Sequence, residues 1–348
     1  MKILYGVQGT GNGHLSRCYT LAQSLAKHHN VEIDYLISGR EPSGLFDMEV
    51  FGDYQWRQGL SFVTERGRLR RRKTLLNNHW QQFWQDVKNL PVTDYDLVIT
   101  DYEPVTAWAS KKQGVRCVGL GRQYAFHEPD LFKRLSWWQK QLISSFAPCS
   151  EPVGMHWLAS GNAIPPVVRQ EENACVGLMQ RVVVYLPFED PQDIIDQLQP
   201  LDNYEFSLFH PKVERKSLGH IECYPPSRTE FAMHFSKASA ILSNAGFETS
   251  CEALSQGKAL AVKPLAGQFE QKWNARILQE HGLASVLKRV ETSDVDSWLA
   301  QREPHRLYWP NVAETLAQWI ADGATQPVAE LSAELWSRNE KPPCRRFF

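Results

Sequence analysis

The segment from Ser243 to Ala275 combines polar side chains with two glycine-containing turns and a helix start, an arrangement that could bind a phosphorylated sugar. It reads SNAGFETSCEALSQGKALAVKPLAGQFEQKWNA. The apolar run Ala240–Leu242 before it predicts a short buried strand, and the small residues Ser243 to Gly246 are typical of a strand-to-helix turn. The helix that follows would direct its free first-turn N–H groups at the end of the sheet, where a phosphate is favoured.

Carboxylates and amides follow this turn at positions that suit sugar hydroxyls. Glu252 lies one helical turn beyond Glu248, where a carboxylate can accept two hydrogen bonds from the vicinal hydroxyls of a ribose. A second predicted strand, Ala259–Val262, leads through the turn Pro264–Gly267 into a polar run that comprises Gln268, Glu270, Gln271 and Asn274. An ordinary βαβ unit with solvated polar turns is the alternative interpretation.

A glycine-rich loop near the start of the chain leads to a histidine that could act as a base. The sequence predicts a strand at Ile3–Val7, the loop Gln8–His14 and a helix over Leu15–His28. The loop is neither the dinucleotide fingerprint nor a P-loop, and a tight turn that lets the helix pack on the sheet would also explain its glycines. A neutral imidazole at His14, above the carboxyl ends of the strands, could take a proton from an acceptor hydroxyl.

An aspartate at the end of another predicted strand could orient this histidine. Leu97–Thr100 reads as a buried strand, and Asp101 follows it at the edge of the sheet where ligands bind. Asp101 could hold a histidine in one tautomer, as the third member of a catalytic triad does. Alternatively, Asp101 caps a helix over Val105–Gln113.

The Ser243–Ala275 segment resembles the donor site of GT-B glycosyltransferases, especially the family of the lipid-II-forming N-acetylglucosaminyltransferase. The resemblance implies that Gly246 is the turn glycine, Thr249 the hydroxyl at the helix start and Glu252 the carboxylate that binds the ribose. It also implies that Glu270 and Gln271 are the pair that binds the sugar, and that Asn274 is the asparagine that follows them. The loop from Pro264 to Gln271 is about a residue shorter than in the lipid-II enzymes. Because Phe247 and Glu248 also replace smaller apolar residues, the identity of the sugar cannot be transferred.

The glycine loop and the strand-terminal aspartate resemble the His/Asp arrangement of inverting GT-B enzymes that glycosylate small hydroxyl acceptors. The resemblance implies that His14 is the base and that Asp101 orients it. It places Gly11, Asn12 and Gly13 near the donor diphosphate or the acceptor. Candidates for the acceptor side are Glu103, Arg122, Gln123 and His127.

The predicted fold is α/β and GT-B, with two Rossmann-like domains that face each other across a cleft. We expect an N-terminal acceptor domain over residues 1–163, a proline-containing linker over 164–179 and a donor domain over 180–325. A C-terminal helix and tail over 326–348 would pack back on the first domain. The predicted strands are Ile3–Val7, Val31–Ile37, Leu97–Thr100, Arg116–Leu120 and Gly154–Leu158 in the first domain, and Val182–Leu186, Phe206–Leu208, Ile221–Cys223, Ala240–Leu242 and Ala259–Val262 in the second.

Length and composition agree with a two-domain enzyme. A chain of 348 residues exceeds the usual size of a single core, and a net charge of −1 gives no indication of nucleic-acid binding. Seven cysteines without a C-x-x-C pair favour neither a zinc site nor a disulfide framework, so we expect a cytoplasmic protein. Asp294 and Asp296 look like a helix start rather than a Mg²⁺ site, so we expect no metal and no cofactor beyond the UDP-sugar donor.

Two basic and aromatic stretches suit an anionic membrane surface. Arg66–Lys73 is strongly basic and precedes several large apolar residues, and Leu131–Phe146 contains Trp137 and Trp138 beside further cations. A solvated charged face and buried tryptophans would explain the same pattern. If the acceptor is lipid-linked, these stretches would hold the enzyme at the inner face of the plasma membrane, although no stretch of about 18 apolar residues exists.

Together these features favour an inverting, metal-independent glycosyltransferase (EC 2.4.1.-). It would move a hexosyl or N-acetylhexosaminyl group from a UDP-sugar to a hydroxyl acceptor, such as a lipid-linked or cell-envelope glycan. A nucleotide-sugar 2-epimerase of the same fold is one alternative, and a regulatory module that binds nucleotide-sugars without catalysis is another.

Overall fold

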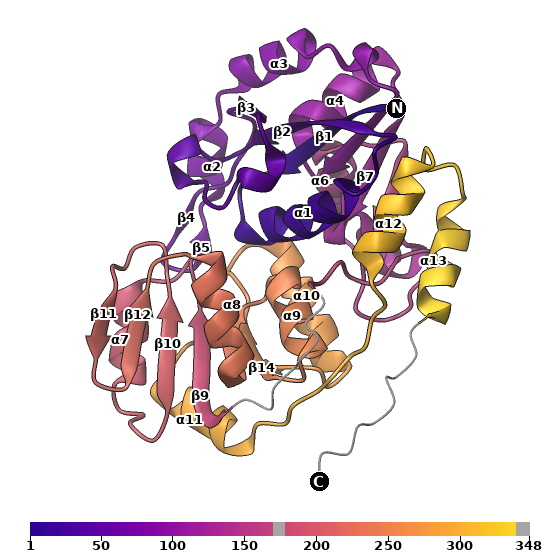
Figure 1. Ribbon diagram of the computed structural model, residues 1–348. Helices are drawn as coiled ribbons and strands as arrows, with labels where there is room; N and C mark the ends of the chain where they lie inside the picture. Colours follow the sequence, from indigo (N-terminus) through magenta and orange to yellow (C-terminus); the bar gives the residue numbers. More distant parts are fainter. Residues whose placement is uncertain (170–177, 339–348) are drawn as a thin grey trace. The chain divides into compact units, whose positions relative to one another are not determined.

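The computed structural model describes residues 1–169 and 178–338, and the chain divides into two compact units (Figure 1). Unit 1 comprises Met1–Ser61, Leu75–Arg169 and Tyr308–Phe348, and unit 2 comprises Phe62–Thr74 and Gln170–Leu307. This division differs from the predicted domains in two places. Residues 62–74 belong to unit 2, and residues 308–325 belong to unit 1. Each unit is therefore built from separate stretches of the chain.

Unit 1 contains a six-stranded sheet in the order β3-β2-β1-β6-β7-β8, and every neighbouring pair is parallel. The strands are β1 (Lys2–Gln8), β2 (Glu32–Ser38), β3 (Gln55–Arg57), β6 (Leu97–Asp101), β7 (Cys117–Gly121) and β8 (Glu151–Gly154). The α-helices are α1 (Asn12–Leu25), α3 (Trp80–Asn89), α4 (Pro104–Gln113), α5 (Pro129–Lys133), α6 (Trp137–Phe146), α12 (Val312–Ala321) and α13 (Val328–Ser337). The 3-10 turns are η1 (Pro42–Gly44), η2 (Glu49–Phe51), η3 (Val92–Asp94) and η4 (Arg122–His127), and α2 (Arg71–Asn77) straddles the division between the units.

Alternation along the strands builds the core of unit 1. Leu4, Leu36 and Val98 point to one face of the sheet, where they pack with Phe83 of α3 and Val105 of α4. Helices α12 and α13 complete the unit from the far end of the chain. There, Arg116 before β7 donates a hydrogen bond of 2.7 Å to Gly323 O, and Ser332 Oγ of α13 donates one of 2.9 Å to Ala163 O.

Unit 2 contains a seven-stranded sheet in the order β11-β12-β10-β9-β13-β14-β15, parallel except for the β11–β12 pair. The strands are β9 (Leu178–Tyr185), β10 (Glu205–Phe209), β11 (Lys216–Leu218), β12 (Ile221–Tyr224), β13 (Ala238–Asn244), β14 (Ala259–Lys263) and β15 (Ser285–Val286). The helices are α7 (Pro191–Leu198), α8 (Arg228–Lys237), α9 (Phe247–Ser255), α10 (Phe269–Glu280) and α11 (Thr292–Gln301). A separate hairpin pairs β4 (Thr64–Glu65) with β5 (Arg68–Leu69).

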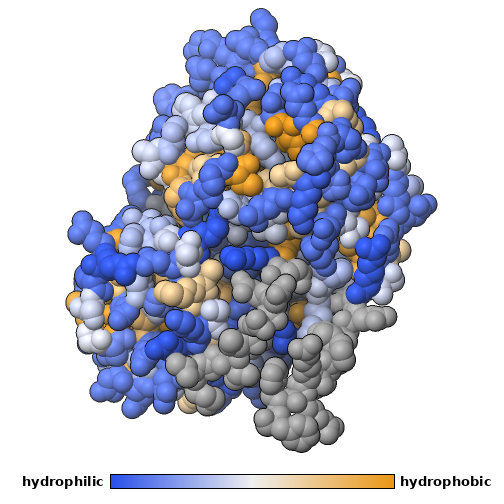
Figure 2. Space-filling model, in the orientation of Figure 1, coloured by the Kyte–Doolittle hydropathy of each residue, from blue (hydrophilic) through white to orange (hydrophobic). Residues whose placement is uncertain are grey.

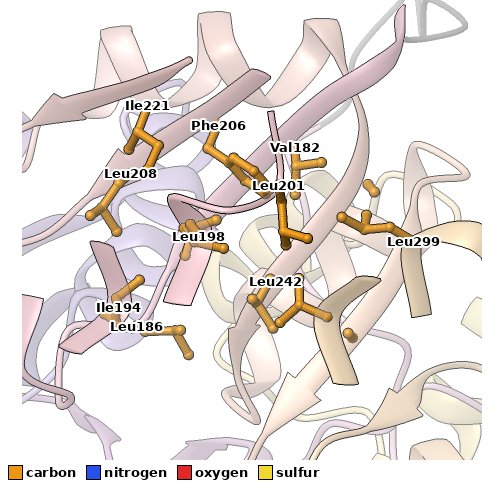
Figure 3. Packing of buried hydrophobic residues seen from close by; sticks show 14 of the residues in the cluster. Val182, Leu186, Ile194, Leu198, Leu201, Phe206, Leu208, Ile221, Leu242 and Leu299 are labelled. Atoms are coloured by element: carbon orange, nitrogen blue, oxygen red, sulfur yellow. The ribbon is translucent and has the colours of Figure 1, made fainter. Parts of the chain in front are cut away.

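The core of unit 2 also follows the period of two in its strands. Val182, Phe206 and Leu242 come from three neighbouring strands and lie on one face, against Leu198 of α7 and Leu299 of α11 (Figure 3). Because both faces of a parallel sheet are covered by helices, its strands read as nearly continuous apolar runs. This is why the sequence predicted these strands correctly.

Five short strands were missed by the sequence prediction, and one predicted strand is misplaced. The predicted strand Gly154–Leu158 is wrong, since β8 ends at Gly154 and a single bridge pairs Met155 with Ile164. The prediction missed β3, β11, β15 and the β4–β5 hairpin, whose two or three residues each carry no clear period. Half of the predicted linker over 164–179 lies outside the described residues.

Polar side chains cover most of the face drawn in Figure 2. Large apolar side chains are exposed at a few positions, which are Leu75, Leu76, Trp80, Trp84, Trp137, Trp138, Leu142 and Met233. Along the described parts of the chain, none of the helices has the length and apolar composition needed to cross a membrane.

Candidate active site

The strand order of unit 1 brings two sequence-predicted residues together. Strands β2 and β6 lie on opposite sides of β1, so chain connectivity reverses beside β1, and ligands of open α/β sheets bind at such a point. Asp101 ends β6 in register with Val7 of β1. His14 stands in the first turn of α1, directly after the loop that follows β1. Neighbouring strands therefore deliver both side chains to one edge of the sheet.

His14, Asp101 and Arg17 form one buried ionic group. His14 Nδ1 lies 2.5 Å from Asp101 Oδ1, while Arg17 donates to both carboxylate oxygens, Nε to Oδ2 at 2.8 Å and Nη2 to Oδ1 at 2.6 Å. The Asp101 and Arg17 side chains are 0% and 3% exposed, and that of His14 is 18% exposed. Burial alone would raise the pKa of Asp101, but the Arg17 guanidinium and the His14 hydrogen bond outweigh it and hold that pKa below its usual range.

The ionised carboxylate fixes the tautomer of His14. Because Asp101 accepts at 2.5 Å, Nδ1 carries the proton, and Nε2 of a neutral imidazole is left as an acceptor. Nε2 lies 3.4 Å from Gln123 Nε2, which is an amide donor. A hydroxyl group at this position would meet the same acceptor nitrogen, so the arrangement can remove a proton from an alcohol.

A polar cavity of about 120 Å³ adjoins the loop that precedes His14. Its lining consists of Gly39, Arg40, Glu41, Gln58, Gly59, Ser61, Asn77, Asn78 and His79, without a large apolar side chain. Arg40 Nη1 donates to Asn12 Oδ1 at 2.7 Å, and Thr10 Oγ1 donates to Gly39 O at 3.1 Å. These bonds tie the cavity wall to the glycine loop.

In unit 2, the turn after β13 presents an uncapped helix start. Gly246 is the N-cap of α9 and offers no side chain to the first-turn N–H groups. A Cβ built on Gly246 would meet nothing within 4 Å, so the space in front of the turn is open. The helix dipole and these N–H groups favour an anion there. Thr249 and Glu252 follow on α9 and are both half-buried.

A comparison of the sequence with models of protein families identifies the family of this chain. The model of the family described as "Glycosyl transferase family 1" matches residues 1–302. The chain belongs to glycosyl transferase family 1. A comparison with curated proteins found no match.

Solved structures with the same fold include three glycosyltransferases that resemble this family-1 chain over nearly its whole length. SnogD from Streptomyces nogalater is 15% identical with a TM-score of 0.52, covering 97% of this chain and 99% of its own. SsfS6 from Streptomyces sp. SF2575, in complex with thymidine diphosphate, is 14% identical with a TM-score of 0.54 and 96% coverage of both chains. MurG from Acinetobacter baumannii is 13% identical with a TM-score of 0.52, covering 97% and 99%. The predicted GT-B resemblance and the α/β fold with two Rossmann-like sheets are confirmed.

Two predicted acceptor-side residues of this glycosyltransferase have buried environments. Glu103 is fully buried and caps α4, because its carboxylate accepts from the backbone N–H groups of Val105 and Thr106 at 2.8 and 2.7 Å. Arg122 is fully buried over the rings of Phe126 and Trp157. Those two predictions are therefore corrected to structural roles.

The other two candidates for the acceptor side, Gln123 and His127, lie in different places. His127 lines a different cavity of about 660 Å³, together with Cys117 and Cys149, and burial lowers its pKa. Gln123 contacts His14, as described above. The structure thus groups only Gln123 with the predicted base.

Two of the predicted sugar-binding residues on α10 bond to the loops that follow β13 and β14. Asn274 is 0% exposed and donates to Ala245 O at 3.1 Å, so it holds the turn before α9. Gln271 is 8% exposed, and its side-chain oxygen accepts from Leu265 N at 2.8 Å. Glu270 is half-buried in the first turn of α10.

Sequence reasoning missed two groups of functional interest in this family-1 enzyme. Arg17 lies three residues after His14 on α1, a helical spacing that places both on one face and could have been noticed. Lys263 and Glu189 form an ion pair at 2.5 Å beside Asn244, at the carboxyl ends of β14, β9 and β13. No group of three or more His, Cys, Asp or Glu side chains arranged to hold a metal occurs within residues 1–169 and 178–338.

Proposed function

We propose that this glycosyltransferase moves a hexosyl or N-acetylhexosaminyl group from a UDP-sugar to a hydroxyl acceptor by a single inverting displacement. The contact of 2.5 Å between His14 Nδ1 and Asp101 Oδ1 carries the proposal, since it leaves Nε2 as the base. The acceptor hydroxyl gives its proton to Nε2, and its oxygen forms the new bond to the anomeric carbon. The bond from that carbon to the diphosphate oxygen breaks, and the electron pair leaves with UDP. One displacement inverts the configuration.

The donor half of the proposal rests on unit 2. The N-terminus of α9 would stabilise the charge of the departing diphosphate, so the reaction needs neither a metal nor a cofactor. Glu252 on the same helix would accept hydrogen bonds from the ribose, and Glu270 from the sugar. SsfS6, with the same fold, was solved with thymidine diphosphate, which supports a nucleoside diphosphate as part of the donor.

The acceptor would be a lipid-linked or cell-envelope glycan. The polar cavity beside Asn12 has a volume of about 120 Å³ and offers amide, hydroxyl and guanidinium groups to hydroxyls. This polar lining suits the hydroxyl groups of a sugar better than an apolar multi-ring aglycone.

Exposed apolar residues support attachment at the inner face of the plasma membrane. Leu76 is 83% exposed on α2 and Trp137 is 76% exposed on α6. Arg71 and Arg72 precede Leu76, and Lys140 accompanies Trp137 on α6, which suits anionic headgroups. Flotation with anionic and with neutral vesicles tests this part; equal recovery with both would contradict it.

Binding and turnover assays test the reaction. Calorimetry with UDP and dTDP should show binding that Glu252→Ala abolishes. UDP release from a panel of UDP-sugars with a cell-envelope extract should fall by about 10²–10⁴-fold in His14→Gln, the contribution typical of a general base. His29→Gln is the matched control, since His29 is an exposed histidine that follows α1, and it should keep the parent rate.

Other outcomes would select another function. Conversion of the UDP-sugar to its 2-epimer without an acceptor would indicate an epimerase. Tight UDP binding without turnover of any sugar, and unchanged by His14→Gln, would indicate a regulatory module. If Glu252→Ala bound UDP as well as the parent does, the donor assignment would be wrong.

A further inference from the structure

The β4–β5 hairpin has a turn of unusual composition. Thr64 pairs with Leu69 and Glu65 with Arg68, which leaves Arg66 and Gly67 as a two-residue turn. Their φ angles are 46° and 67°, so both are left-handed, as a type I′ turn requires. Asn, Asp or Gly is favoured at the first position, and an arginine there is strained. A strained residue in an otherwise regular turn points to a role for its side chain.

The hairpin docks on two loops of unit 2. Gly67 N donates to Phe188 O at 2.7 Å, after β9. Ala266, after β14, donates through its N to Gly67 O at 2.9 Å and accepts at its O from Leu69 N at 2.8 Å. A Cβ on Gly67 would lie 2.0 Å from Glu189 Oε2, and its φ of 67° also favours glycine. The docked position is thus defined by backbone bonds on both sides.

The order of strands in the sheet of unit 2 determines which strand end lies under the hairpin. Strands β9 and β14 are the two neighbours of β13, and neighbouring strands lie about 4.8 Å apart. A hairpin bonded to the loops after β9 and β14 must therefore cross the carboxyl end of β13, where Asn244 leads into Gly246 and α9. Asn244 is 5% exposed, and its Oδ1 has no hydrogen-bond partner among the described residues.

The hairpin also brings charge to this place. Arg70 and Lys73 are paired with Glu65, whereas Arg66 and Arg68 are exposed and enter none of the described salt bridges. Two uncommitted guanidinium groups thus flank Gly67 at the docking point. Guanidinium groups bind phosphate oxygens through two parallel hydrogen bonds.

We propose that the β4–β5 hairpin is part of the donor site and that Arg66, assisted by Arg68, binds the diphosphate of the nucleotide. The inference rests on the proposed function, because it assumes a nucleoside diphosphate in front of Gly246. Residues from the first 74 positions would then stabilise the leaving group on unit 2, together with the helix dipole of α9.

Arg66→Asn in the full chain gives the sharpest test, because it removes the charge and also relieves the turn. We expect UDP to bind about tenfold more weakly by calorimetry, the effect of losing one charge-assisted hydrogen bond. Binding of uridine, followed by ligand-observed NMR, should stay unchanged, and the melting temperature should be equal or higher. Arg72→Gln removes a charge from α2 instead and should change none of these values.

Two further variants complete the test. Gly67→Ala should also weaken UDP binding, because its Cβ drives the turn away from Glu189. If the parent binds UDP and both Arg66→Asn and Arg66→Asn/Arg68→Gln bind it within about twofold of the parent, the hairpin has no role in donor binding and the inference is wrong. If the parent binds no nucleoside diphosphate at all, the proposed donor site itself is refuted, and this inference with it.

Discussion

Asp101→Asn tests the buried ionic group of unit 1 most directly. The substitution keeps the shape of the side chain but removes its charge, so the Arg17 guanidinium, 3% exposed, loses its ion pair with Asp101. Removing one partner of a buried ion pair costs about 3–5 kcal/mol, a large part of a total stability of about 5–15 kcal/mol. We therefore expect a folded protein whose first unit unfolds at a clearly lower urea concentration at pH 7.

The difference should also depend on pH in one direction. The pKa of Asp101 is lowered in the folded state, so its contribution to stability is complete above the unfolded-state pKa of about 3.9 and is lost as the pH falls through the folded value. Parent and variant should thus differ most above about pH 5 and converge in more acidic solution.

Urea unfolding between about pH 3 and pH 7, followed by tryptophan fluorescence, measures this difference. Asp53→Asn, an exposed aspartate of the same unit, is the control and should leave both midpoint and pH dependence unchanged. UDP release with acceptor should fall by about 10³–10⁴-fold in Asp101→Asn, because the imidazole loses its orienting carboxylate. Equal midpoints of parent and variant at pH 7, or a difference that persists undiminished in acid, would refute the reasoning.

Three further substitutions test positions that the fold constrains. Glu103→Ala should destabilise unit 1 by at least about 1–2 kcal/mol in urea unfolding, since it removes the cap of α4, and it should leave UDP affinity unchanged. Asn274→Ala should weaken UDP binding in calorimetry without direct contact, because the bond to Ala245 O is lost; undiminished affinity would show that the turn is held by other groups. Gly154→Ala should lower the melting temperature, because the new Cβ would lie 2.3 Å from Ala125 Cα and overpacking of this kind costs about 1–3 kcal/mol. An unchanged melting temperature would mean that η4 moves to make room for the methyl group.

The sequence alone predicted both sheets because their central strands are apolar runs bounded by turn residues. Leu97–Thr100 and Ala240–Leu242 are examples, and the structure extends each by one to four residues. Short edge strands such as β3 and β15 escaped prediction, since their position depends on backbone pairing rather than on side-chain period.

The sequence did not show which polar side chains near the strand ends are buried, and this limited the prediction of individual site residues. His14 and Asp101 follow neighbouring strands, and strand order brought them into contact. Glu103 and Arg122 also follow strands, yet their side chains turn into the protein, to cap a helix and to lie over aromatic rings. A single sequence does not distinguish a polar side chain that faces a ligand from one that satisfies the backbone.

The interleaving of the two units bears on how the chain folds during synthesis. Unit 1 needs α12 and α13, whose contacts include the bond from Ser332 to Ala163. Ribosomes add about 5–20 residues per second, so Ser332 is synthesised on the order of ten to thirty seconds after Ala163. The amino-terminal sheet must therefore persist without its last two helices while unit 2 is made. We expect chaperones to bind this chain during that interval.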